Sequence, residues 1–220
     1  MKQSSQIPLE LGHEPSFELA DFIVSDSNYA ASQLVQSWPH WSSHVTALVG
    51  PEASGKTHLA RAWAAGADAV ILRPNDDISR LARGTAVLVE EPIESGWCEE
   101  NLFHLFNWIK EISGSLLITA KQPPSRWDIQ LPDLKSRLAT ITVGEIAEPD
   151  DDLLAILLAK LFSDRQLQVD AAVIAYILPR IERSFAAVVD MVEKLDKAAL
   201  ADKRKISRSL AKACLSAELD

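Results

Sequence analysis

Short apolar runs alternate with amphipathic stretches up to about residue 147. Five of these runs are rich in β-branched residues and predict buried parallel strands at 45–49, 69–72, 85–89, 115–119 and 139–143. Apolar residues at three- and four-residue spacing predict helices over 28–38, 56–65 and 99–112. Strands that alternate with helices in this way are typical of an α/β fold with a parallel sheet.

The pattern changes after Glu148, where strand-like runs stop. Helical spacing then predicts helices over 151–164, 171–181, 184–201 and about 207–219, the last one capped by Ser207. The N-terminal segment is polar and shows no sustained period. We therefore expect a flexible arm over 1–16, an α/β domain over 17–147 and an α-helical domain over 148–220.

Composition places the chain among ordinary globular proteins. It has 220 residues, 47% hydrophobic and 24% charged, with a formal net charge of −9. The negative charge argues against a protein that coats nucleic acid, and we expect no sequence-specific DNA binding. No apolar stretch has the length of a signal peptide or a membrane span, so we expect a cytoplasmic protein with no membrane partner.

Residues 50–57 fit the phosphate-binding pattern G-x-x-x-x-G-K-[ST], and they lie between a predicted strand and a predicted helix. Backbone N–H groups of such a loop surround a phosphate chain, and the helix N-terminus adds a positive dipole end. Lys56 would reach the β- and γ-phosphates, and the Thr57 hydroxyl would bind Mg²⁺. The pattern predicts a nucleotide with Mg²⁺, held by Gly50, Pro51, Ala53, Ser54, Gly55, Lys56, Thr57 and His58.

Two acids, Glu90 and Glu91, end the third predicted strand. A P-loop site needs such acids at a neighbouring strand end, to hold the metal ion and to orient water. Glu90 stands at the metal position and would share Mg²⁺ with Thr57, whereas Glu91 stands at the water-polarising position. The alternative is a pair of solvated acids. Thr119, which ends the fourth strand, is a weaker candidate for a γ-phosphate contact.

Several strings in order make the chain resemble the AAA+ ATPases, and their DnaA/Hda branch in particular. They are GKTHL at 55–59, a segment at 17–28, LPDLKSRL at 131–138 and EPDD at 148–151. The resemblance implies a P-loop AAA+ parallel-sheet domain followed by a small helical lid. It also implies that the nucleotide is ADP or ATP, that Phe22 and Val24 bind adenine and that Arg137 is an arginine finger. Arg183 is a candidate for the lid arginine that reaches the phosphates.

The arm contains an apolar island that also matches this branch. Its short members carry a segment of the type Q-L-x-L-x-L that binds the DNA polymerase sliding clamp, and residues 6–11 resemble it. Gln6 would fill a small polar pocket, while Leu9 and Leu11 would lie in an apolar groove, and Ile7 is a further partner-binding candidate. No string typical of the origin-binding helix-turn-helix of DnaA follows the lid region, so the resemblance is to the short regulators.

The resemblance implies a regulator of chromosome replication initiation. Arg137 would enter the nucleotide site of DnaA and promote hydrolysis of its ATP, which prevents over-initiation, while the clamp localises the protein. One alternative is a nucleotide-binding adaptor that recruits a partner without stimulating hydrolysis. Another is a stand-alone ATPase or helicase loader. The sequence leaves open whether the chain forms a homodimer and how fast it hydrolyses ATP itself.

Overall fold

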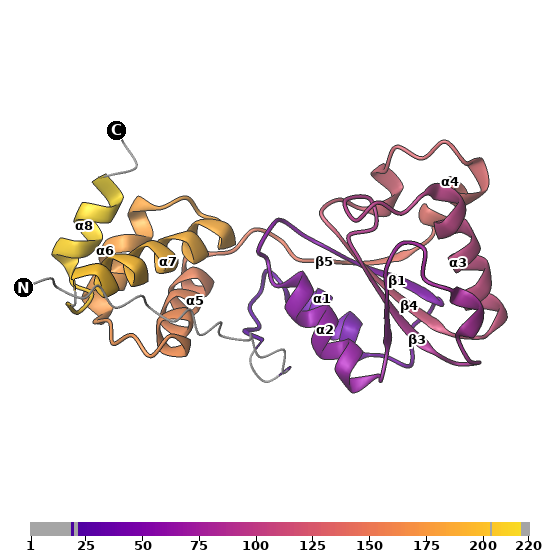
Figure 1. The fold of residues 1–220 in the computed structure, drawn as a ribbon, viewed down its shortest axis with the longest axis horizontal. Helices are drawn as coiled ribbons and strands as arrows, with labels where there is room; N and C mark the ends of the chain where they lie inside the picture. The colour runs from indigo at the N-terminus through magenta and orange to yellow at the C-terminus, as the bar shows by residue number, and fades with distance from the viewer. Residues whose placement is uncertain (1–18, 20–21, 203, 217–220) are drawn as a thin grey trace, which may run out of the picture.

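The computed structural model describes Leu19, residues 22–202 and residues 204–216. They form two lobes side by side, an α/β lobe and a purely helical one (Figure 1). The arm with Gln6, Ile7, Leu9 and Leu11 lies outside the described residues.

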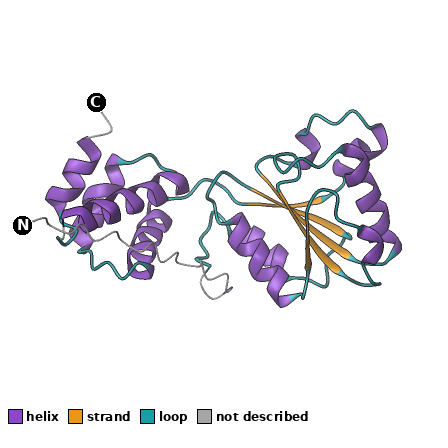
Figure 2. Ribbon diagram, in the orientation of Figure 1, coloured by secondary structure: helices purple, strands orange, loops and turns teal. Residues whose placement is uncertain are grey.

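A five-stranded parallel sheet forms the centre of the first lobe (Figure 2). Its strands are β1 (Val45–Val49), β2 (Val70–Leu72), β3 (Ala86–Glu90), β4 (Ser115–Ala120) and β5 (Thr142–Glu145). Their order is β2-β3-β4-β1-β5. The edge strand β5 therefore pairs with β1, the strand that precedes the P-loop. The α/β fold predicted from the alternating pattern is confirmed.

Helices cover both faces of this sheet (Figure 1). On one face lie α1 (Tyr29–Gln36) and α2 (Lys56–Gly66), and on the other lie α3 (Glu99–Glu111) and α4 (Pro132–Leu138). Strand β4 shows the resulting period of two: Leu116 and Ile118 join the core beneath α3, whereas Leu117 joins the core beneath α2. Burial on both faces explains why the central strands β1, β3 and β4 read as mostly apolar runs.

The fifth strand begins later than predicted. The sequence prediction placed it at 139–143, but Ala139 closes α4 and the strand starts at Thr142. Pro132 occupies the first turn of α4, where its missing N–H costs nothing, and Leu134 and Leu138 are both buried at a spacing of four. The prediction missed this helix because its seven residues are too few to show a clear period.

The helical lobe contains α5 (Asp151–Asp164), α6 (Ala171–Ile177), α7 (Phe185–Asp202) and α8 (Arg208–Ser216). Their facing apolar residues form a separate core, which includes Leu158, Phe162 and Leu195. Helix α6 ends before the predicted residue 181, because Pro179 lies in a 3₁₀ turn over Leu178–Arg180. The Ser207 hydroxyl accepts the Leu210 N–H at 3.4 Å, as predicted for the cap of the last helix.

None of the helices among the described residues is long and apolar enough to cross a membrane.

Glu99 ties the start of α3 to the segment before α4. Its carboxylate accepts the N–H groups of Gln130 and Leu131 at 2.7 to 3.1 Å. We expect Glu99→Ala to lower the free energy of unfolding by about 2 kcal/mol, because it leaves these donors without a charged acceptor. Chemical denaturation measures this change. The exposed neighbour provides the control, since Glu100→Ala should change stability by less than about 0.5 kcal/mol; equal effects would contradict the assignment.

Candidate nucleotide-binding site

The P-loop turns between the end of β1 and the start of α2 in a conformation that needs small residues. Gly55 has φ of +88°, and a Cβ there would lie 3.0 Å from the Phe22 ring. A Cβ on Gly50 would lie 2.9 Å from the Ile146 carbonyl oxygen. Ala53 also has a positive φ, of 56°. Alternating backbone signs of this kind turn successive N–H groups toward one point, which suits an anion.

Lys56 is buried inside this loop, with only 4% of its side chain exposed. Its Nζ donates to the Pro51 carbonyl at 2.7 Å and lies 3.8 Å from Glu91 Oε1. Burial lowers the pKa of Lys56 from its ordinary value of 10.5, and the nearby Glu91 carboxylate opposes that shift. The Ser54 hydroxyl is also buried, with no hydrogen-bond partner among the described residues. Both groups can pair with a phosphate bound in the loop.

The lowered pKa of Lys56 predicts a pH dependence of nucleotide binding. A bound phosphate favours the charged ammonium, so the complex holds its proton more tightly than the free protein does. Binding then takes up a proton above the free-state pKa, and the dissociation constant should rise with pH there, toward tenfold per unit. Phosphate ionisation, near pH 6, is complete in this range.

Titrations with ADP between about pH 7.5 and about pH 10.5 measure this rise. The Lys56→Arg variant is the matched control, because its guanidinium stays charged throughout. If the dissociation constant rose equally with pH in both proteins, a group other than Lys56 would cause the rise.

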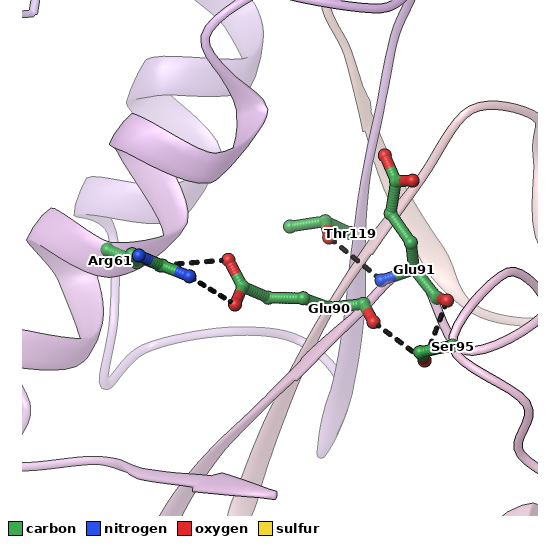
Figure 3. Close-up of polar contacts among 5 residues, drawn as sticks. All are labelled: Arg61, Glu90, Glu91, Ser95 and Thr119. Carbon is green, nitrogen blue, oxygen red and sulfur yellow. Dashed lines mark hydrogen bonds and ion pairs between the residues drawn. The ribbon is translucent and has the colours of Figure 1, made fainter. Parts of the chain in front are cut away.

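The two acids at the end of β3 point in different directions (Figure 3). Both oxygens of Glu90 accept hydrogen bonds from Arg61 on α2, from Nε at 3.1 Å and from Nη2 at 2.9 Å. This contact raises the pKa of Arg61. Glu91 instead faces Lys56. Glu91, the acid predicted to polarise water, is therefore closer to Lys56 than Glu90 is.

Hydroxyl groups fix the backbone at this strand end (Figure 3). The Glu91 N–H donates to Thr119 Oγ1 at 3.1 Å, and Ser95 Oγ donates to the carbonyls of Glu90 and Glu91 at 3.1 and 2.8 Å. Thr119 is fully buried. Its hydroxyl therefore supports the turn at Glu91, and its weaker candidate role as a γ-phosphate contact stays a prediction from the sequence.

For the predicted Mg²⁺, the residues fit only in part. Thr57 lies exposed in the first turn of α2 and can offer its hydroxyl. The oxygens of Glu90, its predicted co-ligand, are engaged by Arg61. Among the described residues no group of three or more His, Cys, Asp or Glu side chains could hold a metal ion.

A cleft of about 410 Å³ lies between the P-loop and the helical lobe. From the first lobe, Phe22 and His58 line it with their ring centroids 5.8 Å apart, next to Ala53, Ser54 and Gly55. From the second lobe its apolar lining comes from Leu153, Leu157, Leu161 and Phe185. An aromatic and aliphatic wall beside a phosphate loop suits a flat heterocyclic base.

One of the two adenine residues predicted from the resemblance is not in this cleft. Phe22 lines it, but Val24 is 50% exposed and lies outside, and its neighbour Ile23 lines the cleft instead. The side chain of Asn28 holds this segment, because its Nδ2 donates to the Ile23 carbonyl at 2.8 Å.

The basic residues of the helical lobe that line the cleft are not the one predicted from the sequence. Arg183 does not line the cleft; it is 74% exposed and pairs with Asp151 at 2.6 Å. Lys160 and Arg165 of the α5 region line the cleft instead. The sequence carries a signal for Lys160, since it continues the stripe of Leu153 and Leu157 at three- and four-residue spacing. Sequence reasoning missed it because a lysine on an amphipathic helix is usually a solvated residue.

Arg137 lies far from this cleft in the fold. It belongs to α4, on the sheet face opposite α2 (Figure 1). Its guanidinium carbon lies 5.0 Å from the centroid of the Phe103 ring on α3, a cation–π contact. The structure therefore does not bring Arg137 together with the P-loop of its own chain.

Both the sequence and the fold of this chain are similar to those of known proteins. Residues 150–215 match the family model described as Hda, lid domain. The structure is similar to domain III of the Thermotoga maritima replication initiation protein DnaA, with a TM-score of 0.75 at 14% identity over 92% of this chain and 97% of that one. A single-residue variant of Thermotoga maritima RuvB gives 0.72 at 14% identity, with 92% and 72% covered.

Two further relatives extend the comparison. A structure of DnaA bound to AMPPCP and single-stranded DNA gives a TM-score of 0.65 at 18% identity, with 87% of this chain and 69% of that one covered. An uncharacterized protein of Haemophilus influenzae is 24% identical over 231 residues, which is 97% of this chain and 99% of that protein.

A parallel-sheet P-loop lobe with a helical lid is the AAA+ fold. The helical lobe, over residues 150–215, matches the Hda lid family, and the likeness to DnaA domain III supports the same fold for the chain as a whole.

Proposed function

We propose that this protein is a DnaA-related regulator of replication initiation. It holds an adenine nucleotide in the cleft between its lobes and promotes hydrolysis of ATP bound to DnaA. The observation that carries the proposal is an Hda-type lid on a chain whose Arg137 stands apart from its own P-loop.

Nucleotide binding rests on the P-loop and on the wall beside it. Lys56 and the loop N–H groups take the phosphates, and Phe22, Ile23 and the lid leucines take the base. One related structure is described as DnaA bound to AMPPCP, which supports an adenine nucleotide for this cleft.

The arginine finger acts on another subunit in this proposal. A guanidinium stabilises the charge that develops on the transferred phosphoryl group, so it must reach the γ-phosphate. Arg137 lies on the sheet face away from α2, which suits contact with a neighbouring molecule. DnaA is the neighbour that the family relationship favours.

The N-terminal arm localises the protein in this proposal. Residues 1–16 are the arm, 17–147 the nucleotide-binding domain and 148–220 the lid. Gln6, Ile7, Leu9 and Leu11 bind the sliding clamp, so that hydrolysis follows the passage of the replication machinery.

The test measures the nucleotide carried by DnaA. DnaA preloaded with labelled ATP is incubated with this protein and with clamp loaded on DNA. We expect ADP to accumulate with the complete set and not when the clamp is left out, or when Gln6, Leu9 and Leu11 are all replaced by alanine. Binding of the protein to the clamp with DnaA's ATP left intact would overturn the proposal in favour of a recruiting adaptor.

A further inference from the structure

We infer that Arg61 is a positioning residue that keeps Glu90 from serving Mg²⁺, so that this chain holds its own nucleotide largely independently of the metal ion. The inference concerns the chain's own site and so deepens the proposed nucleotide binding. It does not depend on the action on DnaA.

The first observation is that both oxygens of the Glu90 carboxylate accept hydrogen bonds from Arg61. Arg61 meets both oxygens in a forked arrangement at 3.1 and 2.9 Å. This two-point geometry is the strongest form of an Arg–carboxylate contact. A metal ion that needs an oxygen of Glu90 must compete with that fork. The side chains are 40% and 24% exposed, so the contact is partly shielded from water.

The second observation is where the fork draws the carboxylate. Thr57, the hydroxyl that would share the metal ion, and Arg61 are four residues apart on α2 and so lie on the same face of this helix. Arg61 is therefore about 6 Å further from the P-loop along the helix axis. The fork therefore joins Glu90 to a residue of the helical turn that follows the one carrying Thr57.

The third observation is that Glu91 does not replace Glu90. Its carboxylate pairs with Lys56 at 3.8 Å. Its backbone is held with φ of +42° by the bonds to Thr119 and Ser95. One acid is therefore committed to Arg61 and the other to the P-loop lysine, and the rigid turn keeps the two apart.

The test is the ratio of nucleotide affinities with and without Mg²⁺, measured by calorimetry with ADP on the full chain in excess Mg²⁺ and in EDTA. We expect this ratio to stay within about threefold for the wild type. In Arg61→Ala, Glu90 is released, and Mg²⁺ should strengthen ADP binding at least tenfold. The double variant Arg61→Ala/Glu90→Gln should lose that gain. Arg80→Ala, which breaks an exposed ion pair with Asp77, is the matched control and should behave as the wild type.

The Glu90→Gln variant alone keeps the inference testable if Arg61→Ala does not fold. It should bind ADP with the metal dependence of the wild type, because Glu90 does not serve the metal ion in the wild type. A strong Mg²⁺ dependence in the wild type that Glu90→Gln removes would overturn the inference. An unchanged ratio in folded Arg61→Ala would also overturn it. Failure of every protein to bind ADP would instead contradict the proposed nucleotide binding itself.

Discussion

Arg137→Ala should lower the hydrolysis of DnaA-bound ATP in the complete assembly by about 10³-fold, close to the rate without this protein. The reason is that an arginine finger supplies charge stabilisation of that order to phosphoryl transfer. Truncation at Arg137 removes only a guanidinium that rests on the Phe103 ring, so the fold of α4 should persist. The experiment is a single-turnover time course with labelled ATP on DnaA.

Lys135 provides a matched control on the same helix. It is a cation two residues from Arg137 and is exposed. Lys135→Ala should change the single-turnover rate by less than about threefold, because loss of an exposed charge is worth little. Equal losses in both variants would mean that α4 contributes a general basic surface and not a finger.

Lys56→Ala should weaken nucleotide binding to this chain by about 10- to 100-fold, the worth of a hydrogen bond to a charged group. Lys56 is the buried cation of the P-loop, and burial strengthens its interaction with phosphate. Fluorescence anisotropy with a labelled ADP measures the loss. The free energy of unfolding should stay the same or rise slightly, because the variant removes an ammonium group whose charge is disfavoured by burial.

Lys121→Ala is the control for this second result. Lys121 lies near Lys56 but is 43% exposed and pairs with Glu52 across 3.7 Å. Its removal should weaken ADP binding by less than about threefold. If Lys121→Ala and Lys56→Ala weakened binding equally, the effect would come from the overall potential around the loop and not from the phosphate contact of Lys56.

The architecture could be predicted because local signals agree with the fold. The central strands β1, β3 and β4 are buried and mostly apolar runs, and most predicted boundaries lie within a residue or two of the observed ones. The exceptions are the end of α6 and the region of α4 and β5. A helix of seven residues shows two buried leucines and no longer period, so the β-branched residues at 140–143 dominated the prediction.

The site could be predicted only where the backbone dictates it. The P-loop follows from glycine positions and from the strand and helix around it. The pairing of Glu90 with Arg61 could not, because both residue types are common at strand ends and on helices, and only the register of α2 against β3 brings them together. The same holds for Arg183, whose partner Asp151 lies 32 residues earlier.

In the proposed function, Arg137 acts in a partner's nucleotide site and not in its own. The direct measurement uses Arg137→Ala in two single-turnover assays, one with labelled ATP on DnaA and one with labelled ATP on this chain alone. We expect loss of the first reaction and no change in the second. Unchanged hydrolysis on DnaA together with slower hydrolysis on this chain would contradict a finger that acts on the partner.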